Sequence, residues 1–567
     1  MTGNTHNWWS LLLLAAMPVS RLAAQIPVPV KDTTRPAAKL LQDVVVTGQF
    51  APQSLRNSVY NVRVVKQEQI KMRGATDIAG VLNNELGIRF STDYTLGETD
   101  IKIQGMGGQR VKILLDGVPL IDRDAVKQSL AQIDIHSIER IEIVEGPMSV
   151  IYGTDALAGV INIITKKGNA GDGLAVNASM QEGSAGNAYN ALSGEGTHNQ
   201  HIDLLWQQKG WQFSAYGTRN TTGGYNDTAA FPAKVAKPKD QWITGGTLGY
   251  RNDRLETWYR IDYLDEKLFS AGVMSVNTYT GFDQYYITNR YMHQAQAAWK
   301  AADKLSVNLA ASYQDYKRKT ESYTKDYRNG EKSPTDADDP NNAGQWDVSS
   351  FRTLFLRGTA QWTLSPLLSL QPGIEIKSDK TSGQRVAGNP AINDYAVFTS
   401  AEIRPVRWIN IRPGTRFSKN SVYNAPPFIP SVNTRFTFSK NLDLRLAYAR
   451  GFRAPILREL YFDFHDASHS IDGNPDLKAE YSNSFTGSLT WQNNIPSGVR
   501  LRSAVSGFYN HFHDFIRMAF DAGRETYSYF NLSDYKTTGA TLENSISYKT
   551  FSATLGFSYL GRYNPFA

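Results

Sequence analysis

The stretch that decides the fold reads VKILLDGVPL at residues 111–120 and IERIEIVEGPMSVIYGTDALAGVINIITKK at residues 138–167. It contains three short runs rich in valine and isoleucine, separated by glycine, proline and aspartate. These runs are Val111–Leu115, Ile138–Val144 and Val160–Thr165. Such runs bounded by turn residues predict strands of a small compact domain. The composition and the period change after Lys167, so we predict a small head domain joined to a much larger all-β remainder.

The head domain, residues 50–168, alternates strand and helix signals. Apolar residues at helical spacing predict helices at Lys66–Lys71 and Asp77–Leu86, with Thr76 or Asp77 as the N-cap of the second helix. The domain contains no Ser/His/Asp, zinc-ligand or paired-carboxylate spacing. The sequence therefore indicates no catalytic centre in the head domain.

From Gly173 to Ala567, apolar and polar residues alternate with a period of two. In the segment Lys304–Gln314, one face carries Leu305, Val307, Leu309, Ala311 and Tyr313. Strands of about ten alternating residues with aromatic residues near their ends are typical of outer-membrane β-barrels, and we count roughly eighteen such segments. The mean hydropathy of −0.40 agrees with a barrel, because lipid-facing and lumen-facing residues average out.

The connections between these segments are of two kinds. Gln208–Trp211 is a short turn, whereas Thr320–Ser349, Ser378–Asn393 and Ile456–Glu480 read as long polar loops. Outer-membrane barrels have short periplasmic turns and long external loops. The three long segments are therefore predicted to face the cell exterior.

The composition argues against several classes of function. The formal net charge is +7, from 60 Lys and Arg against 53 Asp and Glu, and no Lys/Arg run of the nucleic-acid-binding type occurs. The chain has no cysteine, so it has no disulfide framework and no thiolate chemistry. No window approaches the ~20 consecutive apolar residues of a membrane-spanning helix.

Residues 1–24 have the features of a secretory signal peptide, with an apolar core at Trp8–Met17 and a small-residue site at Ala23-Ala24. Residues 25–49 read as a proline-containing linker that ends with DVVVTG at residues 43–48. A β-branched segment after such a linker can add as an edge strand to the sheet of another protein. The alternative is that this segment forms the first strand of the head domain.

Several motifs resemble those of TonB-dependent outer-membrane receptors. DVVVTG resembles a TonB box, and LLDGVPL at residues 114–120 with residues 138–166 resembles the plug domain of that family. FRAP at residues 452–455 and NPDL at residues 474–477 resemble boxes of its haem, cobalamin and siderophore members. The TonB box implied by the resemblance consists of Asp43, Val44, Val45, Val46, Thr47 and Gly48. The implied plug motif comprises Asp116, Gly117, Glu139, Arg140, Glu142, Gly146, Pro147, Tyr152 and Gly153.

For the fold, the resemblance implies a mainly β protein with a transmembrane antiparallel barrel at residues 173–567, a barrel that has about 22 strands in the family. An N-terminal α+β plug domain, residues 50–168, fills the barrel. Only roughly 90 residues follow Asn474-Pro475, so we expect roughly three to five C-terminal strands to be absent. A smaller closed barrel is the alternative.

Two positions depart from the family pattern. The usual Ile-Arg-Gly of the plug is Ile103-Gln104-Gly105 here, and Glu145 replaces the arginine of the usual Arg-Gly-Pro. In relatives these arginines make a plug–barrel ion pair. We therefore expect that this ion pair is missing.

For the function, the resemblance implies active transport of a scarce nutrient across the outer membrane of a Gram-negative-type bacterium. A TonB-type energy-transducing protein in the periplasm would pair with residues 43–48. Transport needs no covalent chemistry, so we predict neither an enzyme nor a cofactor. The expected partners are this protein, outer-membrane lipid and a small-molecule ligand, with a monomeric receptor and no nucleic acid. A passive porin, which would need no plug, and a secreted soluble β-protein are the rival classes.

For the ligand, we favour an iron chelate, either a ferric siderophore or haem, over cobalamin. His465 and His469 lie between the FRAP and NPDL boxes, where haem receptors of the family carry a ligand histidine, so either is a candidate for haem iron. The alternative is two loop histidines without a ligand. Further candidate ligand contacts are Tyr94, Tyr323, Tyr327, Arg328 and Trp346.

A calcium site is a further expectation, since cobalamin receptors of the family carry one. Asp336, Asp338 and Asp339 lie in one predicted loop and offer carboxylate oxygens. The alternative is a solvated acidic loop, because the spacing matches no strict calcium loop.

Overall fold

The computed structural model describes most of the chain from Val44 onward. The described residues are 44–49, 53–93, 98–122, 128–168, 171–226, 234–336, 345–465 and 470–564. The predicted signal peptide and most of the predicted linker lie outside them, as do Asp43, Tyr94, Asp338, Asp339 and His469. Within the described ranges, no helix is both long and apolar enough to cross a membrane.

The head domain is built on a five-stranded mixed sheet with the strand order β3-β8-β9-β6-β7. Its strands are β3 (Val62–Lys66), β6 (Val111–Leu115), β7 (Val118–Pro119), β8 (Ile138–Glu145) and β9 (Gly159–Thr165). β9 pairs in parallel with β6 and antiparallel with β8. The three predicted runs are thus confirmed as neighbouring strands, and β6 and β9 are buried along their whole length.

Short helices and a hairpin complete the head domain. They are α1 (Gln67–Met72), α2 (Ile78–Leu82), α3 (Ser149–Tyr152), β4 (Ile88–Asp93) and β5 (Glu98–Ile103), with 3-10 turns at Leu55–Asn57, Gly108–Arg110, Gln128–Gln132 and Ile135–Ser137. Both predicted helices are present, and Asp77 caps α2 by accepting a hydrogen bond from the Gly80 backbone N–H at 2.7 Å. α2 ends at Leu82 and not at Leu86, because Asn83-Asn84 follow and asparagine is a poor helix former.

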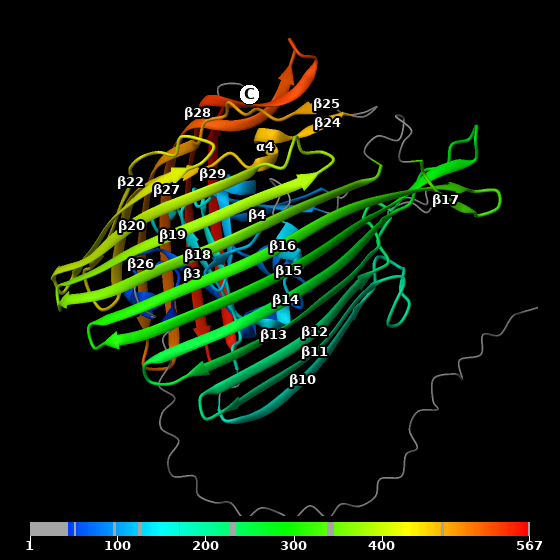
Figure 1. The fold of residues 1–567 in the computed structure, drawn as a ribbon. Helices are drawn as coiled ribbons and strands as arrows, with labels where there is room; N and C mark the ends of the chain where they lie inside the picture. The colour runs from blue at the N-terminus through cyan, green and yellow to red at the C-terminus, as the bar shows by residue number, and fades with distance from the viewer. Residues whose placement is uncertain are drawn as a thin grey trace, which may run out of the picture. The chain divides into compact units, whose positions relative to one another are not determined.

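After the head domain, the described residues form one sheet of twenty strands that follow one another in chain order, as Figure 1 shows for its long strands. Three of them have three residues each, namely β17 (Lys332–Pro334), β24 (Asp463–His465) and β25 (Ser470–Asp472). The long strands are β10 (Gly173–Gly183), β11 (Thr197–Gln208), β12 (Trp211–Thr222), β13 (Lys239–Arg251), β14 (Leu255–Ser270), β15 (Thr280–Ala302), β16 (Leu305–Asp326), β18 (Asp347–Ser365), β19 (Leu368–Gly383), β20 (Ala391–Val406), β21 (Ile409–Asn420), β22 (Ile429–Thr437), β23 (Leu442–Arg453), β26 (Glu480–Asn494), β27 (Val499–Asp521), β28 (Thr526–Tyr548) and β29 (Phe551–Tyr563).

These seventeen long strands agree with the roughly eighteen segments counted from the period-two pattern. The predicted loops are shorter than expected, because cross-strand pairing continues into two of them: β16 runs to Asp326 and β19 to Gly383. The third, Ile456–Glu480, holds a helical turn, α4 (Leu457–Tyr461), and the short strands β24 and β25. Among the described strands, β10 and β29 are the two edges of the sheet.

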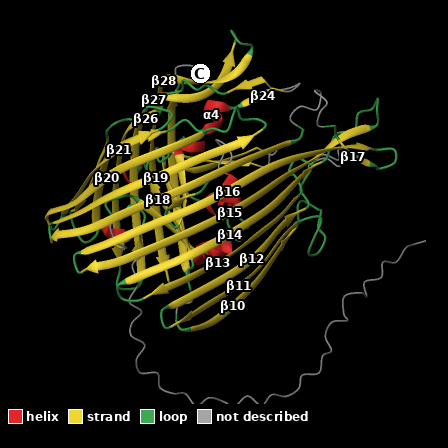
Figure 2. Cartoon of the chain, viewed as in Figure 1, coloured by secondary structure: helices red, strands yellow, loops and turns green. Residues whose placement is uncertain are grey.

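The two faces of the sheet differ in polarity, as the alternation predicts. On β16, the side chains of Leu309 and Tyr313 are 56% and 43% exposed, whereas those of Ser312 and Gln314 are buried. We call the apolar, exposed side the outer face and the polar side the inner face. The expected fold class, an antiparallel barrel-type sheet with an α+β domain inside it, is confirmed; its helices are few and short (Figure 2).

Polar side chains of the inner face hold the head domain by hydrogen bonds to its backbone carbonyl groups. The donor–acceptor pairs are Gln241–Ala131 (3.0 Å), Arg290–Gln132 (2.7 Å), Gln294–Leu115 (3.2 Å), Gln296–Asp116 (2.6 Å) and Gln314–Pro119 (2.8 Å). Buried carbonyl groups need such partners, because leaving one unpaired costs about as much as a lost hydrogen bond. The inner face therefore supplies these carbonyl groups with hydrogen-bond partners.

Gly159→Ala is expected to destabilise the head domain by about 1–3 kcal/mol. Gly159 has φ +153°, and a Cβ there would overlap the carbonyl oxygen of Val144 on the neighbouring strand, which cannot move without breaking the β8–β9 ladder. Limited proteolysis of the purified protein in detergent should cut the head domain sooner than in the wild type. Gly171→Ala is the matched control, since its Cβ meets nothing within 4 Å; equal cleavage of the two variants would contradict the prediction.

Candidate functional site

The segment predicted as the TonB box lies against the head domain. Val44 and Val45 form strand β1, which pairs antiparallel with β2 (Gln53–Ser54) and does not join the five-stranded sheet. Val45 is fully buried in an apolar cluster that includes Tyr60 and Met148. In this state the segment is therefore docked on its own protein, as a strand of a separate two-stranded sheet.

A single carboxylate holds the end of this segment. Glu142 on β8 is completely buried, and its Oε2 atom accepts hydrogen bonds from the backbone N–H groups of Val46 (3.0 Å) and Thr47 (2.8 Å) and from the Thr47 hydroxyl (2.6 Å). Arg140 donates to Oε1 of the same carboxylate at 2.8 Å and balances its charge. Charge-assisted hydrogen bonds of this kind are about twice as strong as neutral ones.

Neighbouring groups complete the docking. The Gly48 N–H donates to the Tyr152 hydroxyl at 2.9 Å, and the Gly48 carbonyl accepts from the Arg412 guanidinium on β21 at 2.7 Å. Gly48 has φ +71°, and a Cβ there would lie only 2.8 Å from Met148 and 2.9 Å from Tyr60, so only glycine fits. We call Val46, Thr47 and Gly48 with Glu142 and Tyr152 the latch.

Burial shifts the pKa of several head-domain groups. Burial raises the pKa of Tyr152 to about 12, so its hydroxyl stays neutral in the latch. It lowers the pKa of Lys112 to about 8, and the Lys112 ammonium donates to the carbonyls of Tyr152 (2.7 Å) and Thr154 (2.9 Å). Burial also acts on Asp116, but the cations Lys167 and Arg260 outweigh it and hold the pKa of this carboxyl below its usual value.

A buried ion-pair cluster connects the head domain to the sheet. Arg110 donates from Nε to Glu480 Oε2 at 3.0 Å, and Glu480 is completely buried at the start of β26. Arg453 on β23 donates to the same carboxylate at 2.9 Å and to Glu459 on α4 at 2.8 Å. Two cations thus face two carboxylates, and the charges of the cluster balance.

The two substituted arginine positions have other partners. Gln104 accepts a hydrogen bond from Asn510 on β27 at 3.1 Å, and Glu145 pairs with Arg63 of the head domain at 3.1 Å. Burial raises the pKa of Glu145, partly offset by Arg63. The head domain is still joined to the sheet by an ion pair, but Arg110 supplies the cation and neither substituted position takes part.

Two of the candidate ligand residues, Tyr323 and Trp346, contact each other. Both ring nitrogens of His465 have partners, because Nε2 lies 2.9 Å from Asp472 and Nδ1 lies 3.2 Å from the Ser470 hydroxyl. Tyr323 shares the outer face of β16 with Tyr313, and its ring contacts Trp346 at 5.8 Å between centroids. Among the remaining described candidates, Tyr327 donates a hydrogen bond to the Gly272 carbonyl at 2.6 Å, and Arg328 forms an ion pair with Asp326. Asp336 also interacts with a neighbouring group.

A cavity of about 110 Å³ lies between the head domain and the inner face. The head domain lines it with Lys112, Leu120, Ile121, Asp122, Thr154 and Asp155, and the sheet lines it with Phe351, Lys377, Asp379, Lys380 and Asp394. Ala454 and Pro455 of the FRAP motif complete its wall. Typical ligand pockets measure about 300–1,000 Å³, so this cavity is too small to enclose a metal chelate.

Residues 54–566 match two family models. Residues 54–160 match the TonB-dependent Receptor Plug Domain, and residues 161–566 match the TonB dependent receptor-like β-barrel. The chain belongs to the TonB-dependent receptor family. It is an outer-membrane protein, its head domain is the plug, and its twenty-stranded sheet is the barrel wall.

Known proteins resemble the chain over most of its length. It is 26% identical over 509 residues to an iron-regulated outer membrane virulence protein of Vibrio cholerae, covering 85% of this chain and 70% of that protein. It is 25% identical to the vitamin B12 transporter BtuB of Vibrio vulnificus, over 82% and 68% of the two chains. The fold matches the siderophore receptor PirA of Acinetobacter baumannii with a TM-score of 0.72 at 17% identity, over 89% and 80% of the chains.

Several residues of this site could not be selected from the sequence. Glu142 belonged to the plug motif, but its role as the acceptor for the docked segment depends on a contact across 95 residues. Arg412 and Tyr60 gave no signal, and neither did Asn162, whose side-chain amide donates to the Thr47 hydroxyl at 2.9 Å. Arg453 belongs to the FRAP motif, and Glu480 follows the NPDL motif at the end of the predicted loop. These motifs therefore indicated the barrel residues of the ion-pair cluster.

Glu142→Gln is expected to loosen the latch by about 2 kcal/mol, which is roughly a 30-fold shift toward the undocked segment, because the hydrogen bonds lose their charged acceptor. The chain has no cysteine, so a nitroxide on Val46→Cys is a unique probe. Its EPR spectrum in detergent should show a larger mobile component in the Glu142→Gln background. Glu139→Gln, whose side chain on the same strand is 52% exposed, should leave the spectrum unchanged; equal spectra in both backgrounds would refute the role of Glu142.

Arg110→Gln is expected to weaken the attachment of the plug by about 3 kcal/mol, because it leaves buried Glu480 with one cation fewer. Hydrogen-exchange mass spectrometry should then show faster exchange in β6 and β9. Arg56→Gln removes a plug–barrel pair that is 3.8 Å long and 30% exposed on the arginine, so its effect should be small. Unchanged exchange in Arg110→Gln would show that the cluster does not hold the plug.

Proposed function

We propose that this receptor takes up a ferric siderophore across the outer membrane, using the segment at residues 43–48 as the handle for a TonB-type protein. The observation that carries the handle is strand β1, which pairs with the two-residue strand β2 and continues into the latch. A β-branched segment that pairs with such a short strand can leave its site and add to the sheet of a partner.

The position of Glu142 explains how a pull on this segment would reach the plug. Glu142 lies on β8, between β3 and β9 in the plug sheet, so force on Thr47 is delivered to an inner strand. The contacts that hold the plug in the barrel include many hydrogen bonds from inner-face side chains to its backbone. Water can replace such hydrogen bonds one at a time, which favours partial displacement of the plug over unfolding of the barrel.

Two observations support a siderophore over the alternatives. The relative from Vibrio cholerae is named as iron-regulated, and the matching solved structures include siderophore receptors. Both nitrogens of His465 already have partners, so haem ligation there would have to break its hydrogen bonds to Asp472 and Ser470. Haem through His465 or His469 and cobalamin, which a 25% identical relative transports, remain the competing ligands.

Val45→Pro is expected to abolish uptake while ligand binding persists, because proline removes a backbone donor from the added strand. Uptake of ⁵⁵Fe-siderophore by whole cells and binding at 0 °C would be measured on the same cultures. Val45→Thr keeps the N–H and the β-branched shape and should transport normally. Normal uptake by Val45→Pro would refute the handle, whereas binding of cyanocobalamin or haemin but of no siderophore would refute the ligand class alone.

A further inference from the structure

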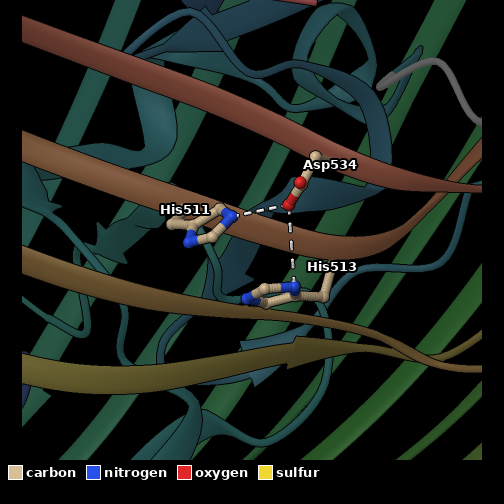
Figure 3. Close-up of side chains that lie close together, drawn as sticks. All are labelled: His511, His513 and Asp534. Carbon is tan, nitrogen blue, oxygen red and sulfur yellow. Dashed lines mark hydrogen bonds and ion pairs between the residues drawn. The ribbon is translucent and has the colours of Figure 1, made fainter. Parts of the chain in front are cut away.

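Two histidines and an aspartate converge on two neighbouring strands. His511 and His513 lie two residues apart on β27, so their side chains leave the same face of the strand. Asp534 on β28 is the direct antiparallel partner of His513. Figure 3 shows the carboxylate of Asp534 between the two imidazole rings, with one interaction drawn to each.

The separations of the three groups are close to those of metal ligands. His511 Nε2 lies 2.6 Å and His513 Nδ1 lies 3.8 Å from the same oxygen of Asp534. One ligand atom from each residue lies within 4.8 Å of the other two. Tetrahedral ligands about 2.0–2.1 Å from a metal ion are roughly 3.3 Å apart, so the shorter separation must open by about 0.7 Å and the longer one close by about 0.5 Å. Metal binding therefore requires only small movements of these side chains.

The three residues lie on the outer face of the barrel and not in the lumen. Tyr509 and Val505 precede the histidines on the same face of β27 and are 43% and 50% exposed. Asn510 and Phe512, on the opposite face, are completely buried against the plug side. The cluster therefore lies on the outer face of β27, between the exposed Tyr509 and the exposed Met518 and Phe520 near the end of the strand, and is separate from the latch.

Aromatic packing holds one of the rings. The Tyr481 ring of β26 stacks on His513 with centroids 4.7 Å apart, and the Arg450 guanidinium lies 4.5 Å from the Tyr481 centroid. The two imidazole centroids are 4.2 Å apart. A ring fixed in this way loses little conformational entropy on binding an ion, so the site is partly pre-organised.

We propose that His511, His513 and Asp534 bind one divalent first-row transition-metal ion, such as Zn²⁺ or Cu²⁺. Two imidazole nitrogens and one carboxylate suit these ions and not Ca²⁺ or Mg²⁺, which prefer an all-oxygen set. Three protein ligands leave room for water in the coordination shell. An ion here would bridge β27 and β28 on the outer wall of the barrel.

A second described cluster, Asp463, His465 and Asp472, provides the matched comparison. It offers a single imidazole, two of its three residues are exposed, and it lies on the short strands β24 and β25. One imidazole with solvated carboxylates makes a weaker site for these ions than two imidazoles. We therefore expect the cluster on β27 and β28 to bind first.

The test uses the full chain, folded in detergent and without a polyhistidine tag, with Cu²⁺ as the probe and Zn²⁺ as competitor. At one equivalent of Cu²⁺, the EPR spectrum should show superhyperfine splitting from two nitrogens. His513→Ala should reduce this to one nitrogen and weaken binding at least tenfold, and His511→Ala should do the same. His465→Ala should leave both the spectrum and the affinity unchanged.

Two results would overturn the proposal. One is the absence of any one-to-one binding of Cu²⁺ or Zn²⁺ by the wild-type chain in the micromolar range. The other is a two-nitrogen spectrum that survives in the double variant His511→Ala/His513→Ala. Asp534→Asn keeps the shape of the side chain and should also weaken binding at least tenfold, so the test does not depend on the folding of the histidine variants.

Discussion

The hydrogen bonds between inner-face side chains and plug carbonyl groups are the interaction on which the rest of the structure depends. A barrel wall with an apolar outer face must turn polar side chains inward, and these groups need partners once water is excluded. Gln294, Gln314 and their neighbours find them on the plug backbone. Apolar packing adds to these contacts, because Met292, Phe355 and Phe512 of the wall belong to the same buried apolar cluster as residues of the plug strands. The plug is therefore held by replaceable hydrogen bonds and by apolar packing against the wall.

In the ion-pair cluster, the structure requires that the buried carboxylates be balanced by cations. It does not require that a cation come from one particular position of the chain. Glu480 is completely buried on the barrel side and requires a cation, because an unpaired buried charge is strongly destabilising. The positions at which the family pattern predicts arginine carry Gln104 and Glu145, and Arg110 and Arg453 pair with the carboxylate in their place. Glu145 is satisfied within the plug by Arg63.

The latch links local chemistry to the fold. Glu142 is the fifth residue of β8. Its carboxylate accepts hydrogen bonds from three donors of the docked segment, because β8 passes beneath that segment. The same strand pairs with β3 and β9, so the acceptor that holds the segment belongs to the core of the plug. A release at the latch and a movement of the plug are in this way mechanically connected.

The sequence by itself determined the fold class, the three strands of the opening stretch and the number of long barrel strands, because these follow from local period and turn chemistry. Strand alternation also puts His511 and His513 on one face of β27, but no motif in the sequence singled them out. Only the tertiary structure decided which distant groups meet: Glu142 with Thr47, Arg110 with Glu480, and Asp534 with His513. These contacts depend on strand register and on how the plug sits in the barrel, and neither is encoded in the spacing of residues along the chain.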